Sequence, residues 1–405
     1  MKQPMDLRLP LRRIPYGVGL AFIVVTLILW QFRLPRSNPA PGHISKHQRW
    51  AETSGLIRDI YNATLGFEKI FVVGLPSRSD RRDGMVLQAA LSDMQIEFID
   101  GIQGKDVPDK AIPISSPDSK RLADGSIGSW RAHLNAAREI VQRNLSSGLI
   151  LEDDTDWDIR IRDQLHDFAL SAHALTQPLR GRPGVYADST YPQPSEDSPE
   201  SAPETDFYRL PATTPPTTSP YGDNWDVLWI GHCGMHFPFH HSKTVPKGRV
   251  IRLDDETVAP KKNLWTFNIP FTLKESYPEH TRAYHHAQEG VCTLGYALSQ
   301  RGARKLLHEV GLKGVTDAYD ILLRFFCEGE KGRAAGRQCL TTQPALFHHH
   351  RTAGRVNGMS DISNHGDNGE FREKAITDMV RWSVRLNVEA LLEGRTDFVD
   401  QFPDE

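Results

Sequence analysis

The sequence predicts an α/β fold in which a mainly parallel sheet is flanked by helices. Three short segments, 70–75, 97–100 and 148–152, have the apolar or β-branched pattern of buried strands. Helical patterns lie between them, and this strand–helix alternation is typical of parallel sheets covered by helices. A chain of 405 residues is long enough for one large core or two small ones.

The elements follow each other in a regular order. After the first strand, at 70–75, the segment 77–82 opens a helix with apolar residues at helical spacing. A second helix, capped by Ser126 or Ser129, is expected to run to Asn144 and to lead into the strand at 148–152.

The second half of the chain interrupts this order. Nine prolines between 183 and 220, among Ser, Thr and acidic residues, predict a disordered insertion without a core of its own. A further apolar strand is expected at 226–231. The segment 371–392 has an amphipathic helical pattern, so we expect residues 366–405 to form a helix and a tail that pack on the domain.

The N-terminal segment predicts a membrane anchor. Residues 14–30 carry no charge and would span about 25 Å as a helix. More basic residues precede this run than follow it, which favours a cytosolic tail at 1–13, a transmembrane signal anchor at 14–32 and a luminal stem at 33–67. The alternative, a cleaved signal peptide, lacks a small-residue cleavage site. We therefore expect a single-pass type II protein of the Golgi or endoplasmic reticulum membrane, with a luminal catalytic domain at 68–365.

A luminal location predicts covalent modifications. Asn62 and Asn144 lie in glycosylation sequons. Four cysteines would pair in an oxidising lumen, and a bond between Cys327 and Cys339 closes a short loop. The remaining two cysteines are Cys233 and Cys292. The other two pairings stay open. The net charge of −3 gives no reason to expect a nucleic-acid partner.

An acidic cluster follows the third strand. Four carboxylates stand within five positions at 152–156, at the strand end where α/β sheets bind ligands. Carboxylate oxygens suit Mg²⁺ or Mn²⁺, which predicts a cation site. Because alternate residues of a strand share a face, Glu152 and Asp154 are expected to act together. In the alternative, Asp153 or Asp154 caps a following helix.

Two further clusters lie at predicted helix starts. Arg78, Arg81 and Arg82 follow the first strand and either face an anionic ligand or form a solvated helix start. Asp317 and Asp320 stand three residues apart at the start of a later helix, so they share one face. In the alternative, Asp317 caps that helix.

The remaining signals concern a metal and a diphosphate. The run 347–351 contains three histidines, one of which could complete a metal shell of carboxylates. The sequence has no Gly-rich phosphate loop, so a cation held by the acidic cluster would have to neutralise a diphosphate instead. Together these features predict a metal-dependent sugar-nucleotide transferase.

The order of these motifs resembles glycosyltransferase family 25, which includes lipooligosaccharide and procollagen galactosyltransferases. The segments that carry the resemblance lie between residues 68 and 362, and they are 71–75 with Arg78, 80–82, 125–133, 149–154, 225–231, 295–307, Asp317, 339–350 and 360–362. The pattern around Cys233, Cys327 and Cys339, together with the anchor, is similar to the fungal branch of the family.

This resemblance implies a GT-A-like, Rossmann-type fold. It also implies an inverting enzyme that uses Mn²⁺ or Mg²⁺ to transfer a hexose from a UDP-sugar to a hydroxyl of a glycan or glycoprotein. The family favours galactose as the hexose. The implied metal ligands are Asp154, Glu152 and His350, with His348 as the substitute for His350. The implied donor-binding residues are Arg78, Arg81, Arg82, His133, Glu152, on the ribose side, and Asp153. Asp317 is the implied general base, with Asp320 as its substitute.

Two other functions remain open at this point. A metal-dependent phosphodiesterase would use the same carboxylates but usually needs a second metal. A non-catalytic luminal glycan-binding protein would need no metal in the acidic cluster. The expected partners of the enzyme are a UDP-sugar, a glycan or glycoprotein acceptor, and the membrane through residues 14–32.

Overall fold

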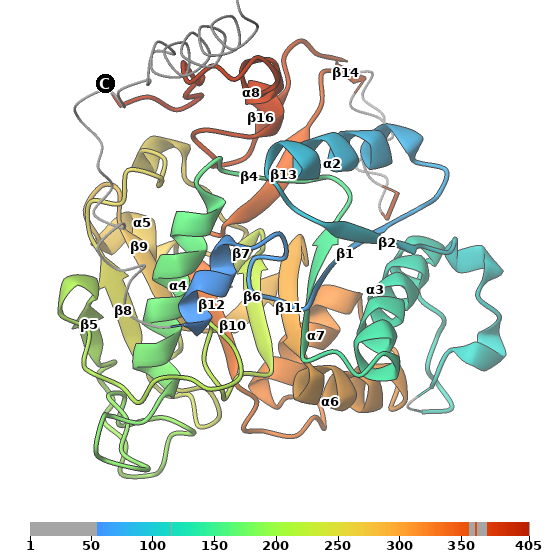
Figure 1. Ribbon diagram of the computed structural model, residues 1–405. Coiled ribbons are helices and arrows are strands. Elements are labelled where there is room, and N and C mark those ends of the chain that lie inside the picture. The colour runs from blue at the N-terminus through green and yellow to red at the C-terminus, as the bar shows by residue number, and fades with distance from the viewer. Residues whose placement is uncertain (1–54, 115, 356–360, 363–370, 405) are drawn as a thin grey trace, which may run out of the picture. The chain divides into compact units, whose positions relative to one another are not determined.

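A nine-stranded sheet lies at the centre of the computed structural model, which describes residues 55–114, 116–355, 361–362 and 371–404 (Figure 1). The strands lie in the order β2-β1-β3-β11-β6-β12-β9-β8-β5. Their bounds are β1 (Lys69–Gly74), β2 (Ile96–Asp100), β3 (Ser147–Glu152), β5 (Glu204–Asp206), β6 (Val227–Gly231), β8 (Arg249–Arg252), β9 (Arg282–His286), β11 (Gly295–Ser299) and β12 (Cys339–Gln343). Only β9 and β11 run against the other strands of this sheet. The prediction of a mainly parallel α/β sheet is confirmed.

The first half of the chain forms the elements that the sequence predicts. Helix α2 (Ser79–Leu91) connects β1 to β2, and α3 (Asp124–Gln142) lies between β2 and β3. Neither Ser126 nor Ser129 caps α3, because both lie inside the helix. The expected caps are therefore wrong, although the helix itself is where the pattern placed it.

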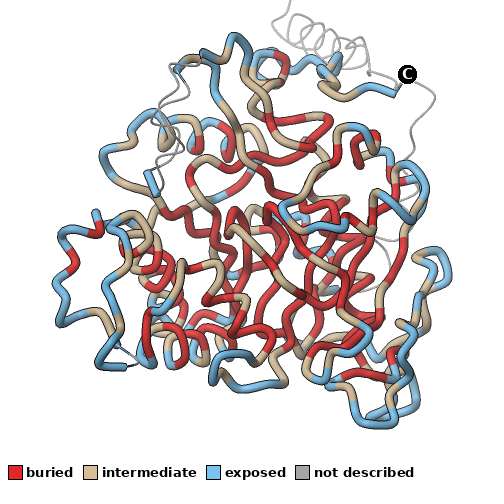
Figure 2. Tube along the Cα trace, turned by 180° about the vertical axis from the view of Figure 1, so that it is seen from behind, coloured by how far each residue is buried: buried red, intermediate tan, exposed pale blue. Residues whose placement is uncertain are grey.

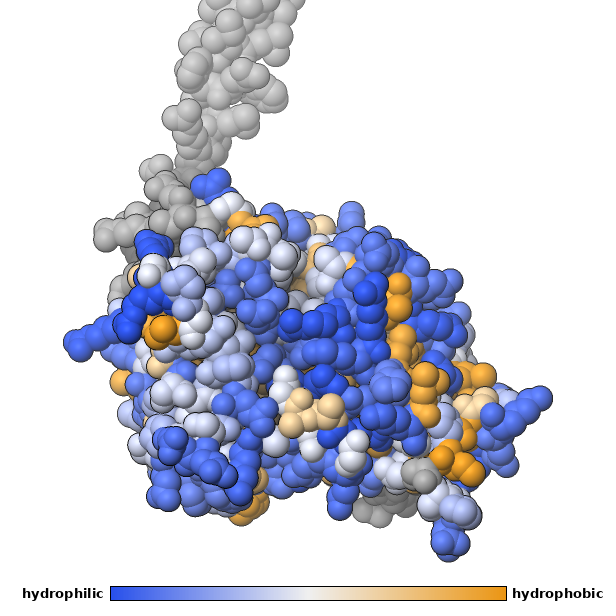
Figure 3. Space-filling view, turned by 90° about the horizontal axis from the view of Figure 1, so that it is seen from below, coloured by the Kyte–Doolittle hydropathy of each residue, from blue (hydrophilic) through white to orange (hydrophobic). Residues whose placement is uncertain are grey.

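Helices cover both faces of the sheet. In β1, Ile70 and Val72 belong to one hydrophobic core, whereas Phe71 and Val73 belong to another. The first core includes residues of α2 and α4 (Ile161–Thr176), and the second includes residues of α3, α6 (Gln300–Gly311) and α7 (Tyr319–Glu328). The buried part of the chain trace lies at the centre of this fold, and the exposed part lies around it (Figure 2). The surface seen from below is mostly hydrophilic (Figure 3).

Smaller elements extend this framework. A three-stranded antiparallel sheet contains β4 (Thr155–Trp157), β13 (Phe347–Arg351) and β16 (Ile376–Thr377), with β13 in the middle. Two further pairs are β7 (Gly234–His236) with β10 (Gln288–Val291), and β14 (Gly354–Arg355) with β15 (Phe371–Arg372). The short helices are α5 (Thr272–Ser276) and α8 (Val388–Leu392).

The segment 183–220 is not the disordered insertion that its composition predicted. It contributes β5, which pairs with β8 at the edge of the central sheet. Tyr191 is buried, and Asp188 accepts hydrogen bonds from the Thr190 hydroxyl and the Gly248 amide at 2.7 and 2.8 Å. A few anchoring side chains order this proline-rich segment against the domain, and a composition argument does not detect them.

The C-terminal segment is not one amphipathic helix. Only α8 is helical, together with a 3₁₀ turn at Arg385–Asn387. The guanidinium groups of Arg160 and Arg381 both pack on the Trp382 ring, at 4.0 and 4.4 Å from its centroid. Contacts with the rest of the domain therefore determine the conformation of this segment, and local helical spacing does not.

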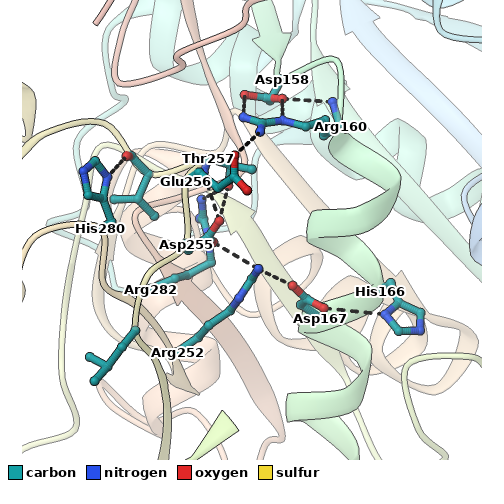
Figure 4. Close-up of polar contacts among 12 residues, drawn as sticks. Asp158, Arg160, His166, Asp167, Arg252, Asp255, Glu256, Thr257, His280 and Arg282 are labelled. Atoms are coloured by element: carbon teal, nitrogen blue, oxygen red, sulfur yellow. Dashed lines mark hydrogen bonds and ion pairs between the residues drawn. The ribbon is translucent and has the colours of Figure 1, made fainter. Parts of the chain in front are cut away.

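Buried ion pairs join α4 to β8 and β9 (Figure 4). The fully buried Asp255 carboxylate lies 2.6 Å from Arg282 Nε and 3.4 Å from Arg252 Nη1. Arg252 also pairs with Asp167 of α4. Burial alone would raise the pKa of Asp255, but the two guanidinium groups outweigh it and hold this pKa well below its ordinary value. Asp255 is therefore ionised inside the protein.

The cysteines form the disulfides Cys233–Cys292 and Cys327–Cys339, the pairing favoured from the short loop. Within the ranges that the structure describes, no helix is long and apolar enough to cross a bilayer. The predicted anchor at 14–32 lies outside those ranges.

Candidate functional site

The acidic cluster lies in a tight turn at the carboxyl end of β3. Glu152 is the last residue of β3, and Asp153 and Asp154 form the turn that leads into β4. The helix-capping alternative is wrong, because the next helix, α4, begins only at Ile161. At the end of β1, Gly74 allows this close packing: a Cβ there would lie 2.1 Å from Asp153 Oδ2.

Three side chains converge on a possible cation site. Glu152, Asp154 and His349 each offer one ligand atom, and these atoms lie within 4.8 Å of one another. The acids come from β3 and its turn, whereas His349 comes from β13. Strand β13 pairs with β4, and the His350 amide donates a hydrogen bond to the Asp154 carbonyl at 2.8 Å. As expected from strand alternation, Glu152 and Asp154 lie together.

The structure brings His349 to the cluster and not His350, so the expected third ligand is corrected. The His350 ring turns to the other side of β13, where its Nδ1 lies 3.0 Å from Thr377 Oγ1. The substitute, His348, is buried with Nε2 2.9 Å from the Ala345 carbonyl. Sequence reasoning missed His349 because the pairing of β13 with β4 decides which imidazole faces the acids.

The chemistry of the cluster fits a divalent cation. Among the described residues, the buried Asp154 Oδ1 has no hydrogen-bond partner, while Oδ2 lies 3.3 Å from Arg81 Nη2. Burial alone would raise the pKa of Asp154, but His349 and Arg81 outweigh it and the pKa lies below its ordinary value. An ionised carboxylate with an unused buried oxygen, beside a second carboxylate and an imidazole, is a suitable donor set for Mn²⁺ or Mg²⁺.

A cavity of about 390 Å³ opens above the cluster. Its walls are the end of β1, the loop 101–105, the start of α3, the acidic turn and two side chains of β13. Residues 361–362 complete the lining. This volume lies in the range of small-molecule and cofactor sites. Five lining residues were not among the individual site residues assigned from the sequence, namely Lys105, Ser129, His349, Arg351 and Asp361.

Only one of the three predicted arginines lines the cavity. Arg81 does so, and its guanidinium lies 2.7 Å from Asp153 Oδ1. Arg78 instead pairs with Asp361 at 2.6 Å, so it supports the wall from outside. Arg82 pairs with the carboxylate at the end of β2. Burial, partly offset by Arg81, raises the pKa of Asp153 to about 6.

His133 lies beside the cluster, as expected. It is buried in α3, its ring stacks on Tyr319 at a centroid distance of 4.4 Å, and Nδ1 lies 3.1 Å from the Tyr296 hydroxyl. Its Nε2 lies 3.5 Å from Glu152 Oε1, which also accepts a hydrogen bond from Thr293 at 2.8 Å. These contacts fix the orientation of Glu152.

Neither predicted base lines the cavity. Asp320, in the first turn of α7, accepts hydrogen bonds from the backbone amides of Cys292 and Ile321, both at 2.9 Å. It therefore anchors the backbone at Cys292, just after β10, where the disulfide to Cys233 is attached. Asp317 precedes α7 without capping it, because the N-cap residue is Ala318. The assignment of Asp317 as general base stays a prediction.

Comparison with known proteins identifies part of the chain. Residues 67–177 match the family model described as glycosyltransferase family 25 (LPS biosynthesis protein). Procollagen galactosyltransferase 1-B of Xenopus laevis is 31% identical over 123 residues, which cover 26% of this chain and 20% of that protein. Procollagen galactosyltransferase 2 of Homo sapiens is 29% identical over 115 residues, which cover 26% and 18%.

A third relative has a different name: inactive glycosyltransferase 25 family member 3 of Homo sapiens, 29% identical over 113 residues, which cover 25% of this chain and 19% of that protein. The chain thus spans about a fifth of the length of these curated relatives. The matched segment runs from just before β1 to the end of α4, and it includes the acidic turn, Arg81 and His133 but not His349. Residues 67–177, called the family 25 domain below, are therefore similar to glycosyltransferase family 25, as the sequence motifs indicated.

Proposed function

We propose that this chain is a metal-dependent glycosyltransferase that moves a hexose, first of all galactose, from a UDP-sugar to a hydroxyl of a glycan or glycoprotein. The cluster of Glu152, Asp154 and His349 at the cavity carries this proposal, because it joins the family 25 domain to a donor set for a divalent cation. The named procollagen galactosyltransferases support galactose as the sugar.

Each side chain has a role in this proposal. Glu152, Asp154 and His349 would hold the cation, which supplies stabilisation of the negative charge on the departing UDP. Arg81 lies at the same wall and would bind the diphosphate oxygens. His133 and Thr293 keep Glu152 in place. A carboxylate, for which Asp317 is the first candidate, would take the proton of the acceptor hydroxyl.

The cellular location is part of the proposal. Two disulfides support an oxidising compartment. With an anchor at 14–32, the enzyme would be a single-pass type II protein of the Golgi or endoplasmic reticulum membrane with its catalytic domain in the lumen.

The two alternatives are less well supported. A two-metal phosphodiesterase needs a second ligand cluster, and the described ranges contain only the one formed by Glu152, Asp154 and His349. A glycan-binding protein without activity needs no cation, whereas Glu152, Asp154 and His349 together are a donor set for one.

The test is a screen of UDP-sugars for UDP release, with and without Mn²⁺, in the presence of glycan and glycoprotein acceptors. We expect Mn²⁺-dependent release, and we expect Asp154→Asn to abolish Mn²⁺-dependent UDP binding while the fold is retained, since Asp154 contributes a ligand and little packing. Asp100→Asn, at the exposed end of the neighbouring strand β2, is the matched control and should leave UDP binding intact. Undiminished Mn²⁺-dependent binding by folded Asp154→Asn would refute the site.

A further inference from the structure

The C-terminal segment 376–387 lies directly behind the candidate site, although it is far outside the family 25 domain. Figure 1 shows β16 and α8 beside β4, β13 and α2. The Asp378 amide donates to the carbonyl of His349 at 3.1 Å, and the Val384 amide donates to that of Trp157 at 3.0 Å. The segment therefore holds both strands that carry the site, β13 with His349 and β4 next to the acidic turn.

The buried Asp156 joins this segment to the family 25 domain. Its Oδ2 accepts hydrogen bonds from the hydroxyls of Thr377, at 2.6 Å, and Ser383. Its Oδ1 accepts one from Gln88 Nε2 of α2 at 2.6 Å. Asp156 stands two residues after Asp154, so these bonds fix the strand just beyond the turn that carries the ligand.

Arg385 reaches from the same segment to the back of the acidic turn. Its Nε donates to Gln88 Oε1 at 2.8 Å, and its Nη2 donates to the Asp153 carbonyl at 3.2 Å. Helix α2 leaves room for it at Gly84, where a Cβ would lie 2.8 Å from Nη1. The guanidinium is thus the direct link between α2, the C-terminal segment and the backbone of the turn.

We propose that Arg385 is a positioning residue for the cation site: it fixes the Asp153–Asp154 turn in the geometry that binds the metal. This inference rests on the proposed function. Two effects of Arg385 on Mn²⁺ affinity oppose each other, because its charge repels a cation whereas its hydrogen bonds hold the ligand turn in place. The positioning hypothesis states that the hydrogen bonds affect Mn²⁺ affinity more than the charge does, because without them the ligand turn is no longer held in the geometry that binds the metal.

The opposite signs allow a decisive measurement. Mn²⁺ binding to the full chain is measured by calorimetry for wild type, Arg385→Lys and Arg385→Met. Positioning predicts that both substitutions weaken Mn²⁺ affinity by about 10–100-fold, the usual effect of losing a residue that orients a metal ligand. A role as a counter-charge alone predicts that the lysine variant keeps its affinity and the methionine variant binds more tightly. Either of these results would overturn the proposal.

Two additional variants separate positioning from general destabilisation. Arg162→Met removes another part-buried arginine, which donates to the backbone carbonyls of Ser92 and Asp93 away from the site. Arg162→Met should lower the unfolding temperature while Mn²⁺ affinity is unchanged. A loss of Mn²⁺ affinity equal to that of Arg385→Met would refute the proposal. Gly84→Ala keeps Arg385 but displaces its guanidinium, and should weaken Mn²⁺ binding without lowering the unfolding temperature.

The same measurement distinguishes this inference from the proposed function. If wild type binds no Mn²⁺, the metal-dependent function fails and the inference fails with it. If wild type binds Mn²⁺ and Arg385→Lys binds it equally well, the function stands and only the positioning role of Arg385 is refuted.

Discussion

Two adjacent histidines of β13 have different environments because a strand alternates its side chains. His349 faces Glu152 and Asp154, whereas His350 faces Thr377 on the other side. Burial lowers the pKa of His350 to about 3, so it is neutral and serves packing and hydrogen bonding near neutral pH. The pair therefore provides a matched comparison of ligand and non-ligand imidazoles.

We predict that His349→Ala lowers Mn²⁺ affinity by at least about 10-fold, because losing a ligand costs no less than losing its support. His350→Ala is the control: it should keep Mn²⁺ affinity within a few-fold and instead lower the unfolding free energy by about 1–3 kcal/mol, because Thr377 loses a buried partner. Titration with Mn²⁺ and urea unfolding check both results. The opposite assignment, with His350 as ligand, would reverse them.

The sequence identified those site residues whose position depends on local structure. Glu152, Asp154 and Arg81 were predicted because a strand end and the following helix start place them at one edge of the sheet. His349 and Arg385 were missed, because they reach the site only through the pairing of β13 with β4 and the return of the C-terminal segment. No periodicity encodes such contacts between distant segments.

The secondary-structure elements likewise divide into those that local periodicity predicts and those that depend on contacts between distant segments. The strands β1, β2 and β3 and the helices α2 and α3 follow from apolar periodicity. The segment 371–392 has helical periodicity as well. However, the Thr377 hydroxyl donates a hydrogen bond to Asp156, and the Trp382 ring packs against two arginines. These tertiary contacts outweigh the local helical propensity.

The ion pairs between α4, β8 and β9 lead to a prediction about stability. Asp255→Ala leaves Arg282, which is 2% exposed, without its carboxylate, and breaking a buried pair in this way costs about 3–5 kcal/mol. Asp397→Ala is the control, because its pair with Arg395 lies at the surface, where solvent screens it, and should contribute far less. Urea unfolding measures both variants, and equal losses would contradict the prediction.

The whole molecule should lose stability on mild acidification. Burial lowers the pKa of five histidines to about 3 or 4, namely His232, His285, His286, His348 and His350. Because the unfolded chain binds these protons below pH 6.5 and the folded chain does not, stability falls as the pH decreases. Burial raises the pKa of Glu328 to about 7 and that of Asp153 to about 6, and these groups act in the opposite direction.

Each of the five histidines contributes a loss of about 1 kcal/mol between pH 6.5 and 5.5, and the acids with raised pKa values, which also include Asp156, Asp158 and Asp378, offset part of it. Urea unfolding at these two pH values checks the size of the loss. Calorimetry in buffers of different ionisation enthalpy should show net proton uptake on unfolding. Stability that is constant or rises towards pH 5.5 would contradict the prediction, because the buried acids would then outweigh the histidines.

The assembly of the site from distant segments has a consequence for biosynthesis. Residues 67–177 leave the ribosome well before the imidazole on β13 and the guanidinium of Arg385. Contacts of such high sequence separation form after local structure, and domains fold as synthesis proceeds from the N-terminus. A nascent chain that has completed only β1 to β4 would contain the acids but neither the imidazole beside them nor the guanidinium that holds their turn. Under the proposed function, sugar transfer would begin only when β13 and the segment around Arg385 have folded, and shorter nascent chains would be catalytically silent.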